Sequence, residues 1–463
     1  MKILKFGQNS MKNPERLATL KEIVVAAFKK EPVAVVLSAS AGVTGLLTAA
    51  TERASRGDES FREQVAELQE RHLDAVRLLF PPREHAGVIT AIQLLLNDLE
   101  ELLHGVELIR ECSARTLDLM LSFATRLSST LVGAYLRQQG LPVRLVDARS
   151  LIFTDNRHGK AVVDFRRTYE LIRGHLGSSP GEIAVIPGGI ASAGEGVTTT
   201  LGDNGSDYTA SLIAAGLSAQ SIEIWTDHQG VMSADPEFVN EAFMVPELSY
   251  QEAMELSYFG ARIIHPYTMI PAVEQDIPIV IKNILHPDRA GTLIARTVRP
   301  QPHPITGIAC IDDITLVNVE GGGMIGLQGI AARIFGALAR AEVNVIMISQ
   351  ASSEHSICLG FKENNPERVL DALRGELAEE IAAKRVEDFN LLKDMVIIAV
   401  IGENMRGTPG MSGRLFSALG NARINVFAIA QGSSERNISF MIRAADKAEA
   451  LRTIHQAFLS PGG

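Results

Sequence analysis

The chain has 463 residues, 46% of them apolar and 21% charged, which excludes a disordered chain and suffices for a large core. At roughly 100–200 residues per domain, this length predicts two to four domains. The net charge of −10 argues against nucleic acid or an anionic membrane as a partner. The three scattered cysteines fit neither a disulfide framework nor a zinc site, so no metal site is predicted. Because the chain lacks both a signal peptide and a long apolar run, we expect a cytoplasmic protein.

The first 295 residues alternate strand patterns with helix patterns. Strands are predicted at 2–6, 33–40, 143–148, 182–189, 222–227 and 277–283. Helices are predicted at 14–30, 60–80, 88–104 and 113–138. Near-continuous apolar strands separated by helices indicate an α/β fold whose mostly parallel sheet is covered on both faces. Ligands bind outside the carboxyl ends of such strands, so the loops after the strands are the candidate sites.

A proline-rich segment at 297–307 is predicted to be a linker, and an internal repeat follows it. Residues 316–361 align without a gap with residues 397–442, and Gly321 matches Gly402 at an offset of 81 positions. Each copy shows strand, glycine-rich turn, helix, strand, turn and strand, the first part of a ferredoxin-like βαββαβ unit. Two such units can pair their sheets and leave matched pockets at the seam.

Polar residues recur at the strand ends of both copies. Gln350 matches Gln431, and the Ser-Ser-Glu sequence at 352–354 matches the one at 433–435. This recurrence favours pockets that bind an effector. The alternative is that the glycine-rich turns only cap helices.

Several segments, in chain order, resemble one known family. They are VVLSASAGVT (35–44), VTTTLGDNGSDYTASLIAA (197–215), EIWTDHQGVMSADP (223–236) and SYQEAMELSYFGARIIHP (249–266). Together with QASSEHSI and AQGSSERNIS of the repeat, they are similar to the aspartokinases, especially those regulated by threonine or lysine. The resemblance covers essentially the whole chain.

The resemblance implies an αβα sandwich of the amino-acid-kinase fold followed by two ferredoxin-like ACT domains. The implied boundaries are a kinase domain at 1–296, the linker at 297–307, and ACT domains at 308–388 and 389–463. We expect the chain to lack the homoserine dehydrogenase domain that is fused to some relatives.

The implied reaction is phosphoryl transfer from ATP to the side-chain carboxylate of L-aspartate, the first step toward lysine, threonine and methionine. ATP and Mg²⁺ are the implied cofactors, and lysine or threonine is the implied feedback effector. Such transfer needs positioning and charge neutralisation more than covalent help. A pair of ACT domains implies a homo-oligomer. Neither nucleic acid nor a membrane is an expected partner.

Site residues carry over where this sequence keeps the family pattern. Lys5 and Asp207 are the implied catalytic residues. The implied substrate-binding residues are Ser38, Ala39, Thr44 and Ser206. The implied ATP-binding residues are Lys5, Gly7, Ser10, Thr226, Asp227 and Arg262. The implied effector-binding residues of the repeat are Met324, Gln350, Ser352, Glu354 and Gln431.

Four positions depart from the family pattern. Gln8 replaces a glycine of the first loop, and Thr125 replaces the glutamate that holds the substrate ammonium. Asp203 replaces the arginine that holds the substrate α-carboxylate, and Glu237 replaces an arginine on the phosphate side. Each change alters charge or adds a side chain at the implied site.

Three functions are therefore compatible with the sequence. The first is an aspartate kinase with altered kinetics. The second is a catalytically impaired pseudokinase, natural or engineered, that binds an effector and forms a hetero-oligomer with an active aspartokinase. The third is a kinase for a different acid. Nucleotide binding discriminates among them, because only the second tolerates its loss.

Overall fold

The computed structural model describes residues 1–177, 181–260, 264–299, 301–324, 329–350, 356–362, 366–387 and 389–460. The chain divides into two compact units, which are described separately. Unit 1 contains residues 1–231, 246–250 and 263–298, and unit 2 contains residues 232–245, 251–262 and 299–463. No helix among the described residues is both long and apolar enough to cross a membrane.

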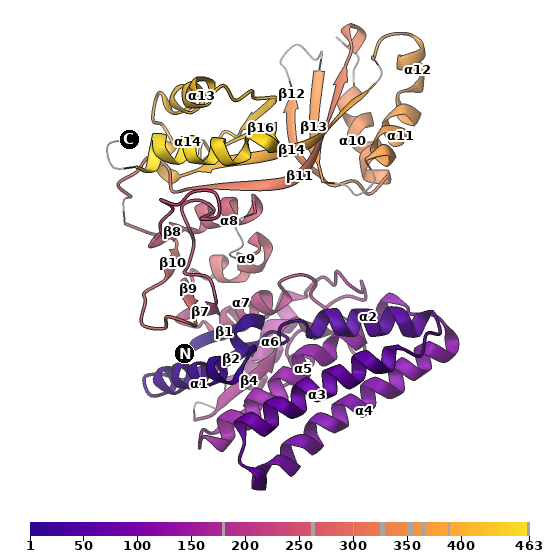
Figure 1. Cartoon of the computed structure of the whole chain (residues 1–463), viewed down its shortest axis with the longest axis vertical. Coiled ribbons are helices and arrows are strands. Elements are labelled where there is room, and N and C mark those ends of the chain that lie inside the picture. The colour runs from indigo at the N-terminus through magenta and orange to yellow at the C-terminus, as the bar shows by residue number, and fades with distance from the viewer. Residues whose placement is uncertain are drawn as a thin grey trace. The chain divides into compact units, whose positions relative to one another are not determined.

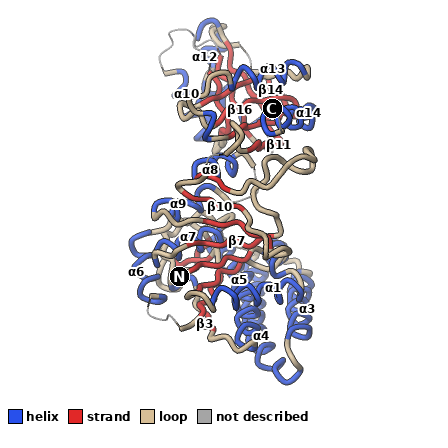
Figure 2. Tube along the Cα trace, turned by 90° about the vertical axis from the view of Figure 1, so that its left-hand side faces the viewer, coloured by secondary structure: helices blue, strands red, loops and turns tan. Residues whose placement is uncertain are grey.

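Unit 1 is built on a mostly parallel sheet, in which only β10 runs antiparallel to a neighbour (Figures 1 and 2). Its described strands, in spatial order, are β3 (Val143–Leu145), β4 (Ile183–Pro187), β2 (Val33–Leu37), β1 (Lys2–Phe6), β7 (Ser221–Thr226), β9 (Ile279–Asn283), β10 (Thr292–Ala295) and β8 (Glu247–Ser249). A hairpin of β5 (Ile190–Ser192) and β6 (Thr198–Thr200) stands apart from this sheet. The central strands are buried along their whole length, as a sheet covered on both faces requires.

Helices cover both faces of the sheet, giving the predicted αβα sandwich. One face carries α1 (Pro14–Phe28), α2 (Val43–Ser55), α3 (Phe61–Leu79), α4 (His85–Ile109) and α5 (Ala114–Gln138). The other face carries α6 (Phe165–Leu176), α7 (Gly205–Leu217) and α9 (Pro266–Glu274). Short 3₁₀ turns are η1 (Gln8–Met11), η2 (Pro82–Glu84) and η3 (Ala148–Ser150). The α1–α5 group forms the indigo and violet cluster of Figure 1.

Strand alternation decides which side chains of β1 can reach a ligand. Leu4 and Phe6 belong to the core cluster under α1–α5. Because successive side chains of a strand point to opposite faces, Lys5 lies on the other face, which α7 covers. The geometry of the strand thus brings a cation to the N-terminal end of α7.

Unit 2 contains a six-stranded antiparallel sheet among its described residues. In spatial order the strands are β12 (Val345–Gln350), β13 (Ser356–Phe361), β11 (Gly307–Glu320), β14 (Asn390–Ile401), β16 (Asn437–Arg443) and β15 (Ala428–Gln431). Its helices are α8 (Tyr250–Tyr258), α10 (Ile330–Arg340), α11 (Glu367–Glu376), α12 (Ala378–Ala382), α13 (Met411–Asn421) and α14 (Lys447–Leu459). Its 3₁₀ turns are η4 (Gly322–Met324), η5 (Glu403–Met405) and η6 (Ala444–Asp446).

The two repeats share their longest strands. The second half of β11 pairs with β13, whereas its first half, from Gly307 to Ile311, pairs with the end of β14. The second repeat therefore takes its fourth strand from the chain that precedes the first repeat. Asp313 and Asp394, which are equivalent in the repeat, both have positive φ (60° and 57°). The ferredoxin-like fold of both repeats is confirmed, whereas the predicted boundaries at 296, 307 and 388 stay predictions.

Part of the predicted kinase domain packs with the second repeat inside unit 2. Ile308 donates its N–H to Ser233 O at 2.8 Å. The buried Glu252 of α8 accepts hydrogen bonds from Thr306 Oγ1 and, at 3.0 Å, from the backbone N–H of Glu403. The segments 232–245 and 251–262 therefore belong structurally with the repeats.

Candidate functional site

A buried ion pair lies at the carboxyl end of β1. Lys5 Nζ is 2.6 Å from Asp207 Oδ1, and each side chain is only 8% exposed. Lys5 is the fourth residue of β1, and Asp207 lies in the first turn of α7. The structure thus brings together the two residues implied to be catalytic, although they are far apart in the sequence.

Two glycine-containing turns pack directly against each other beside this pair. A Cβ atom at Gly188 would be 2.6 Å from Ser206 Cβ, and one at Gly205 would be 2.9 Å from Gly189 Cα. Such distances leave no room for a side chain, so both turns need glycine at the contact. This packing places Ser206 Oγ 2.7 Å from Ser38 Oγ at the end of β2. Gly188 and Gly189 were not among the predicted site residues, although a Gly-Gly pair directly after a buried strand was an available signal.

The loop after β2 is fixed by α5. Ser40 donates its N–H to Ser128 Oγ at 3.0 Å, and the two hydroxyls are 3.2 Å apart. Ala39 is half-buried against the core of unit 1, whereas Thr44 is exposed in the first turn of α2. The structure therefore brings Ser38 and Ser206 into contact, while Thr44 is solvent-exposed.

The loop after β1 is tied to the end of β7. Gly7 donates its N–H to Trp225 O at 3.0 Å, and the buried Ser10 Oγ donates to the same oxygen at 3.1 Å. Asn9 Nδ2 donates to Asp227 Oδ2 at 2.9 Å, and Thr226 Oγ1 is 3.4 Å from Asp227 Oδ1. The predicted nucleotide residues of the two loops thus form one connected group.

The Asp227 carboxyl has opposing influences on its charge. Burial works to raise its pKa, but the hydrogen bond from Asn9 and the charges of His228 and Arg16 outweigh burial and lower the pKa below its usual value. Arg16 Nη1 lies 3.9 Å from Asp227 Oδ2. Asp227 is therefore held as a carboxylate near neutral pH.

The four departures from the family pattern fall in different environments. Gln8 and Asp203 are exposed, and Glu237 is exposed in the segment 232–245 of unit 2. Thr125 is buried in α5, and its Oγ1 has no hydrogen-bond partner among the described residues. Ser129, one helical turn further on, is also buried and has no partner for its Oγ in the described part of the chain.

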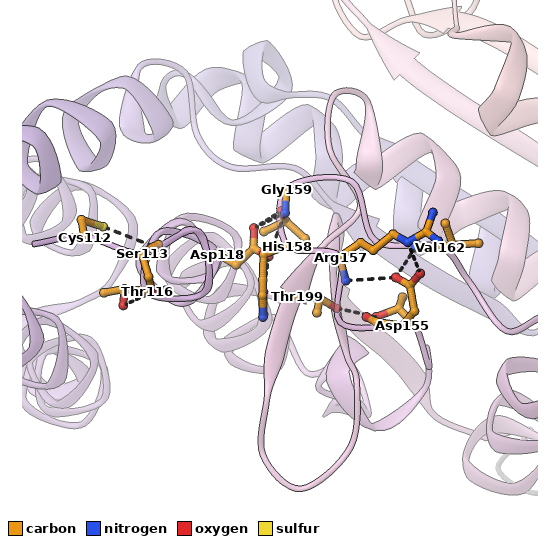
Figure 3. A network of polar contacts seen from close by, with 12 residues as sticks. Cys112, Ser113, Thr116, Asp118, Asp155, Arg157, His158, Gly159, Val162 and Thr199 are labelled. Atoms are coloured by element: carbon orange, nitrogen blue, oxygen red, sulfur yellow. Dashed lines mark hydrogen bonds and ion pairs between the residues drawn. The ribbon is translucent and has the colours of Figure 1, made fainter. Parts of the chain in front are cut away.

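A buried carboxylate in α5 connects three segments around the site, and sequence reasoning missed it (Figure 3). Asp118, 2% exposed, accepts hydrogen bonds from His158 Nδ1 at 2.9 Å, from the backbone N–H of Gly159 at 3.1 Å and from Thr200 Oγ1. The one available signal was an aspartate inside the otherwise apolar helical run TLDLMLSF. Its partners, some 40 and 80 residues away, carry no sequence signal of the pairing.

A surface cavity of about 390 Å³ lies in the second repeat of unit 2. Its lining includes Met405, Gly407, Ser412, Gln431 and Glu435. Ser412 Oγ is 3.4 Å from Gln431 Oε1, and Gly407 donates its N–H to Glu435 Oε2 at 2.7 Å. The predicted effector residue Gln431 therefore lines a pocket.

The equivalent region of the first repeat is described only in part. Met324 is fully buried in the core of that repeat, and Gln350 is exposed at the end of β12. Ser352 and Glu354, like Arg262, lie outside the described residues. The described residues contain no group of three or more His, Cys, Asp or Glu side chains that could hold a metal ion.

Three features of unit 1 lie at one edge of its parallel sheet. They are the buried ammonium group of Lys5, the loop in which Gly7 has no side chain, and the N-terminus of α7. This arrangement suits an anionic substrate, because backbone N–H groups and a lysine can offset negative charge there.

Comparison with known proteins identifies the family. Residues 1–283 match the model of the amino acid kinase family, and residues 317–377 and 398–458 match an ACT domain model. The chain is 35% identical over 460 residues to bifunctional aspartokinase/homoserine dehydrogenase 2, chloroplastic, of Arabidopsis thaliana, covering 98% of this chain and 50% of that protein. It is 30% identical over 470 residues to aspartokinase 1, chloroplastic, of the same plant, covering 99% of this chain and 80% of the relative.

Solved structures agree with the sequence comparisons. E. coli aspartokinase III in complex with aspartate and ADP matches with a TM-score of 0.82 at 28% identity, covering 99% of each chain. The bifunctional relatives are longer, and the chain spans about half of their length. The chain therefore belongs to the aspartokinase family, with an amino acid kinase domain and tandem ACT domains.

Proposed function

We propose that this chain transfers the terminal phosphoryl group of ATP to the side-chain carboxylate of L-aspartate, with feedback by an amino acid bound to its ACT domains. The observation that carries the proposal is the buried Lys5–Asp207 pair, where the end of β1 meets the first turn of α7. The likeness to a structure that contains aspartate and ADP supports the same reaction.

The residues at the ends of β1 and β7 suit the binding of a nucleoside triphosphate. A Cβ atom at Gly7 would be 3.4 Å from Trp225 O and 3.8 Å from Lys5 Nζ, so glycine keeps the space beside the ammonium group free. Gly7, Thr226 and Asp227 would line the nucleotide, and the buried Ser10 would position the Gly7 loop through its hydrogen bond to Trp225 O. Mg²⁺ would enter with the phosphates and offset their charge. Lys5 offsets negative charge on the transferred phosphoryl oxygens, and Asp207 holds the ammonium group in place.

Ser206 and Ser38 would orient the acceptor carboxylate. Their hydroxyls are 2.7 Å apart, and the packing of Gly188 against Ser206 fixes this spacing. Positioning of this kind is most of what phosphoryl transfer asks of a protein, because the reaction needs little covalent help. Neither the geometry nor the comparisons favour the pseudokinase alternative, and no observation favours a different acid as acceptor.

The proposal is tested by aspartate-dependent ADP release from the purified chain with Mg-ATP. Turnover on the order of 1–100 s⁻¹ is expected, as is typical of kinases. The Lys5→Met variant is the matched blank, because it removes the cation and keeps the shape of the side chain. If ADP release is the same with and without aspartate, or the same in this variant, the chain is not an aspartate kinase.

We infer that the feedback effector, lysine or threonine, binds in the pocket lined by Gln431, and we expect a second site at the equivalent position of the first repeat, around Gln350. Support comes from the cavity of about 390 Å³ and from the likeness to E. coli aspartokinase III in complex with lysine and aspartate, at 28% identity and a TM-score of 0.78. Inhibition by each amino acid, measured for the parent and for Gln431→Ala, identifies the effector. The variant should need more of the true effector for half-inhibition.

The remaining parts of the proposal concern assembly and location. We infer a homo-oligomer formed through the ACT domains, because ACT pairs join across a two-fold axis, and light scattering of the purified chain tests it. We place the protein in the cytoplasm, since its three cysteines are all free thiols.

A further inference from the structure

The turn at 202–205, which leads to Ser206 and Asp207 at the start of α7, has little support of its own. Its first three residues are exposed, and Gly202 and Asn204 both have positive φ, 71° and 57°. Asn204 is the N-cap residue of α7, but its side chain caps none of the N–H groups of that helix. Such a turn keeps one conformation only if other segments hold it.

Asp118 of α5 holds the turn at its entrance. This carboxylate is 2% exposed and accepts a hydrogen bond from Oγ1 of Thr200, the last residue of β6. The next residue, Leu201, donates its N–H to Gly189 O at 3.0 Å. The chain is therefore fixed on both sides at the position where the turn begins.

The same carboxylate also supports the turn from the side. The backbone N–H of Gly159 donates to Asp118 Oδ2 at 3.1 Å, and His158 Nδ1 lies 2.9 Å from the same oxygen (Figure 3). The carbonyl oxygen of Gly159 packs against the turn, because a Cβ atom at Gly202 would be 3.3 Å from it. Asp118 thus fixes the backbone segment that the turn contacts.

The helix α5 holds both of the loops that carry the site's paired hydroxyls. Ser128 accepts a hydrogen bond from the N–H of Ser40 at 3.0 Å and so fixes the loop that contains Ser38. Asp118 lies about 15 Å earlier along the same helix, from the rise of an α-helix. One rigid element therefore supports both sides of the contact in which Ser38 Oγ and Ser206 Oγ are 2.7 Å apart.

We propose that Asp118 is a positioning residue for the phosphoryl transfer and acts through Thr200 and the turn that follows it. The inference rests on the proposed function, because the turn delivers Ser206 to the acceptor carboxylate. It also delivers Asp207 to Lys5, 2.6 Å away. A turn that is free to move misplaces both groups, and a displacement of about 1 Å costs roughly 10²-fold in rate.

A purely structural role of Asp118 makes a different prediction, and two variants of β6 separate the roles. Thr200→Val removes only the hydroxyl that reaches Asp118 and keeps the shape of the side chain. Thr199→Val is the matched control, because Thr199 is fully buried in the same strand and its Oγ1 lies 2.7 Å from Thr154 Oγ1 instead. Each variant loses one buried hydroxyl, but only Thr200→Val loosens the turn.

The kinetic test is ADP release by the full chain. Thr200→Val should lower kcat/KM for L-aspartate by about tenfold to a hundredfold, with the KM for ATP unchanged, since a hydrogen bond to a charged group is lost. Thr200→Ser keeps the hydroxyl and should recover most of this loss, and Asp118→Asn should show the same pattern as Thr200→Val. Thr199→Val should behave as the parent. Equal kinetics in Thr199→Val and Thr200→Val would overturn the proposal.

Amide hydrogen exchange followed by mass spectrometry reports on the turn without any turnover. Peptides that cover residues 201–207 should exchange faster in Thr200→Val than in the parent, because local opening of the turn becomes easier. The same peptides should exchange at the parental rate in Thr199→Val. Unchanged exchange of residues 201–207 in Thr200→Val contradicts the role of Asp118.

The two measurements also separate this inference from the proposed function. Faster exchange in Thr200→Val, without turnover in the parent, supports the hold of Asp118 on the turn and rejects the kinase activity. Turnover in the parent with equal kinetics in Thr200→Val rejects the role of Asp118 alone. If the parent does not turn over and exchange is unchanged in the variant, both proposals are wrong.

Discussion

The ion pair of Lys5 and Asp207 makes one prediction at the scale of single residues. Replacing Lys5 by methionine should lower kcat by roughly 10²–10³-fold, because a fixed charge aimed at the transferred group is lost. It should also destabilise the fold by about 3–5 kcal/mol, because Asp207 stays buried and unpaired.

A double variant separates these two effects. Lys5→Met with Asp207→Asn leaves no buried charge, so its thermal unfolding should return toward that of the parent while ADP release stays low. Recovery of activity together with stability would mean that Lys5 has only a structural role.

The contact between Gly188 and Ser206 makes a second prediction. Gly188→Ala places a methyl group 2.6 Å from Ser206 Cβ, so either turn must move. We expect a loss of about 1–3 kcal/mol in stability, as in other overpacked sites, and a rise in the KM for the acceptor. Gly174→Ala, in α6, is the control because its Cβ would meet nothing within 4 Å. Equal kinetics in the two variants would show that the spacing of Ser38 and Ser206 does not matter.

Site residues could be named from the sequence only where it keeps the family pattern, and the resemblance implied Lys5, Thr226 and Ser206. The structure places Lys5 and Thr226 at strand ends and Ser206 in the first turn of a helix. Asp118 and His158 were not predictable, since they are 40 residues apart and no periodicity links them. Pairings between distant segments depend on tertiary packing, which one sequence does not encode in a readable form.

At the scale of elements, long apolar patterns were the easiest to predict. The strand at 2–6 and the helix at 113–138 were predicted nearly to the residue, because a short apolar run and a long amphipathic pattern mark them. Ser113 accepts from Thr116 N–H at 3.2 Å and so fixes the start of α5. The three- and four-residue strands β8 and β10 were missed, because runs of that length carry no period.

The sharing of β11 between the two repeats leads to a prediction about fragments. A fragment that begins at residue 389 lacks Gly307–Ile311, so the fully buried edge of β14 from Ile397 to Ile401 would have no partner strand. We expect such a fragment, ending at residue 460, to aggregate or to remain poorly folded. A fragment of residues 305–460 should unfold cooperatively in urea, as followed by far-ultraviolet circular dichroism. Cooperative unfolding of the shorter fragment would instead support an independent domain from residue 389.

At the scale of the whole molecule, the chain enters unit 2 before the regulatory repeats begin. Residues 232–245 and 251–262 lie in the predicted kinase domain but pack with the second repeat, as the contacts of Ser233 and Glu252 show. A reading of the sequence assigns them to the kinase domain because their neighbours in the chain belong there. The division of the chain into two compact units depends on contacts between distant segments, and these contacts form only in the folded chain.

Two buried histidines, one in each unit, predict how stability depends on pH. His455 in unit 2 is 1% exposed and its Nε2 lies 3.1 Å from Ser233 Oγ. Burial lowers its pKa, and His303 lowers it further while Glu241 opposes the change. His72 in unit 1 is 3% exposed, and burial lowers its pKa as well, although the hydrogen bond to Leu68 O works to raise it. Both imidazoles are therefore neutral in the folded chain near neutral pH.

The sign of the pH effect follows from proton uptake. Below the ordinary histidine pKa of about 6.5, the unfolded chain binds a proton at each imidazole that the folded chain does not bind. Stability should therefore be unaffected by these groups above about pH 6.5 and should fall as the pH drops below it, until the lowered folded-state pKa is reached. Thermal unfolding between pH 8 and pH 5 should show this loss in the parent. His455→Gln should flatten it for unit 2, His72→Gln should flatten it for unit 1, and the exposed His228→Gln should leave it unchanged. Parallel curves for all four proteins would show that carboxylates, rather than these buried imidazoles, cause the acid sensitivity of the fold.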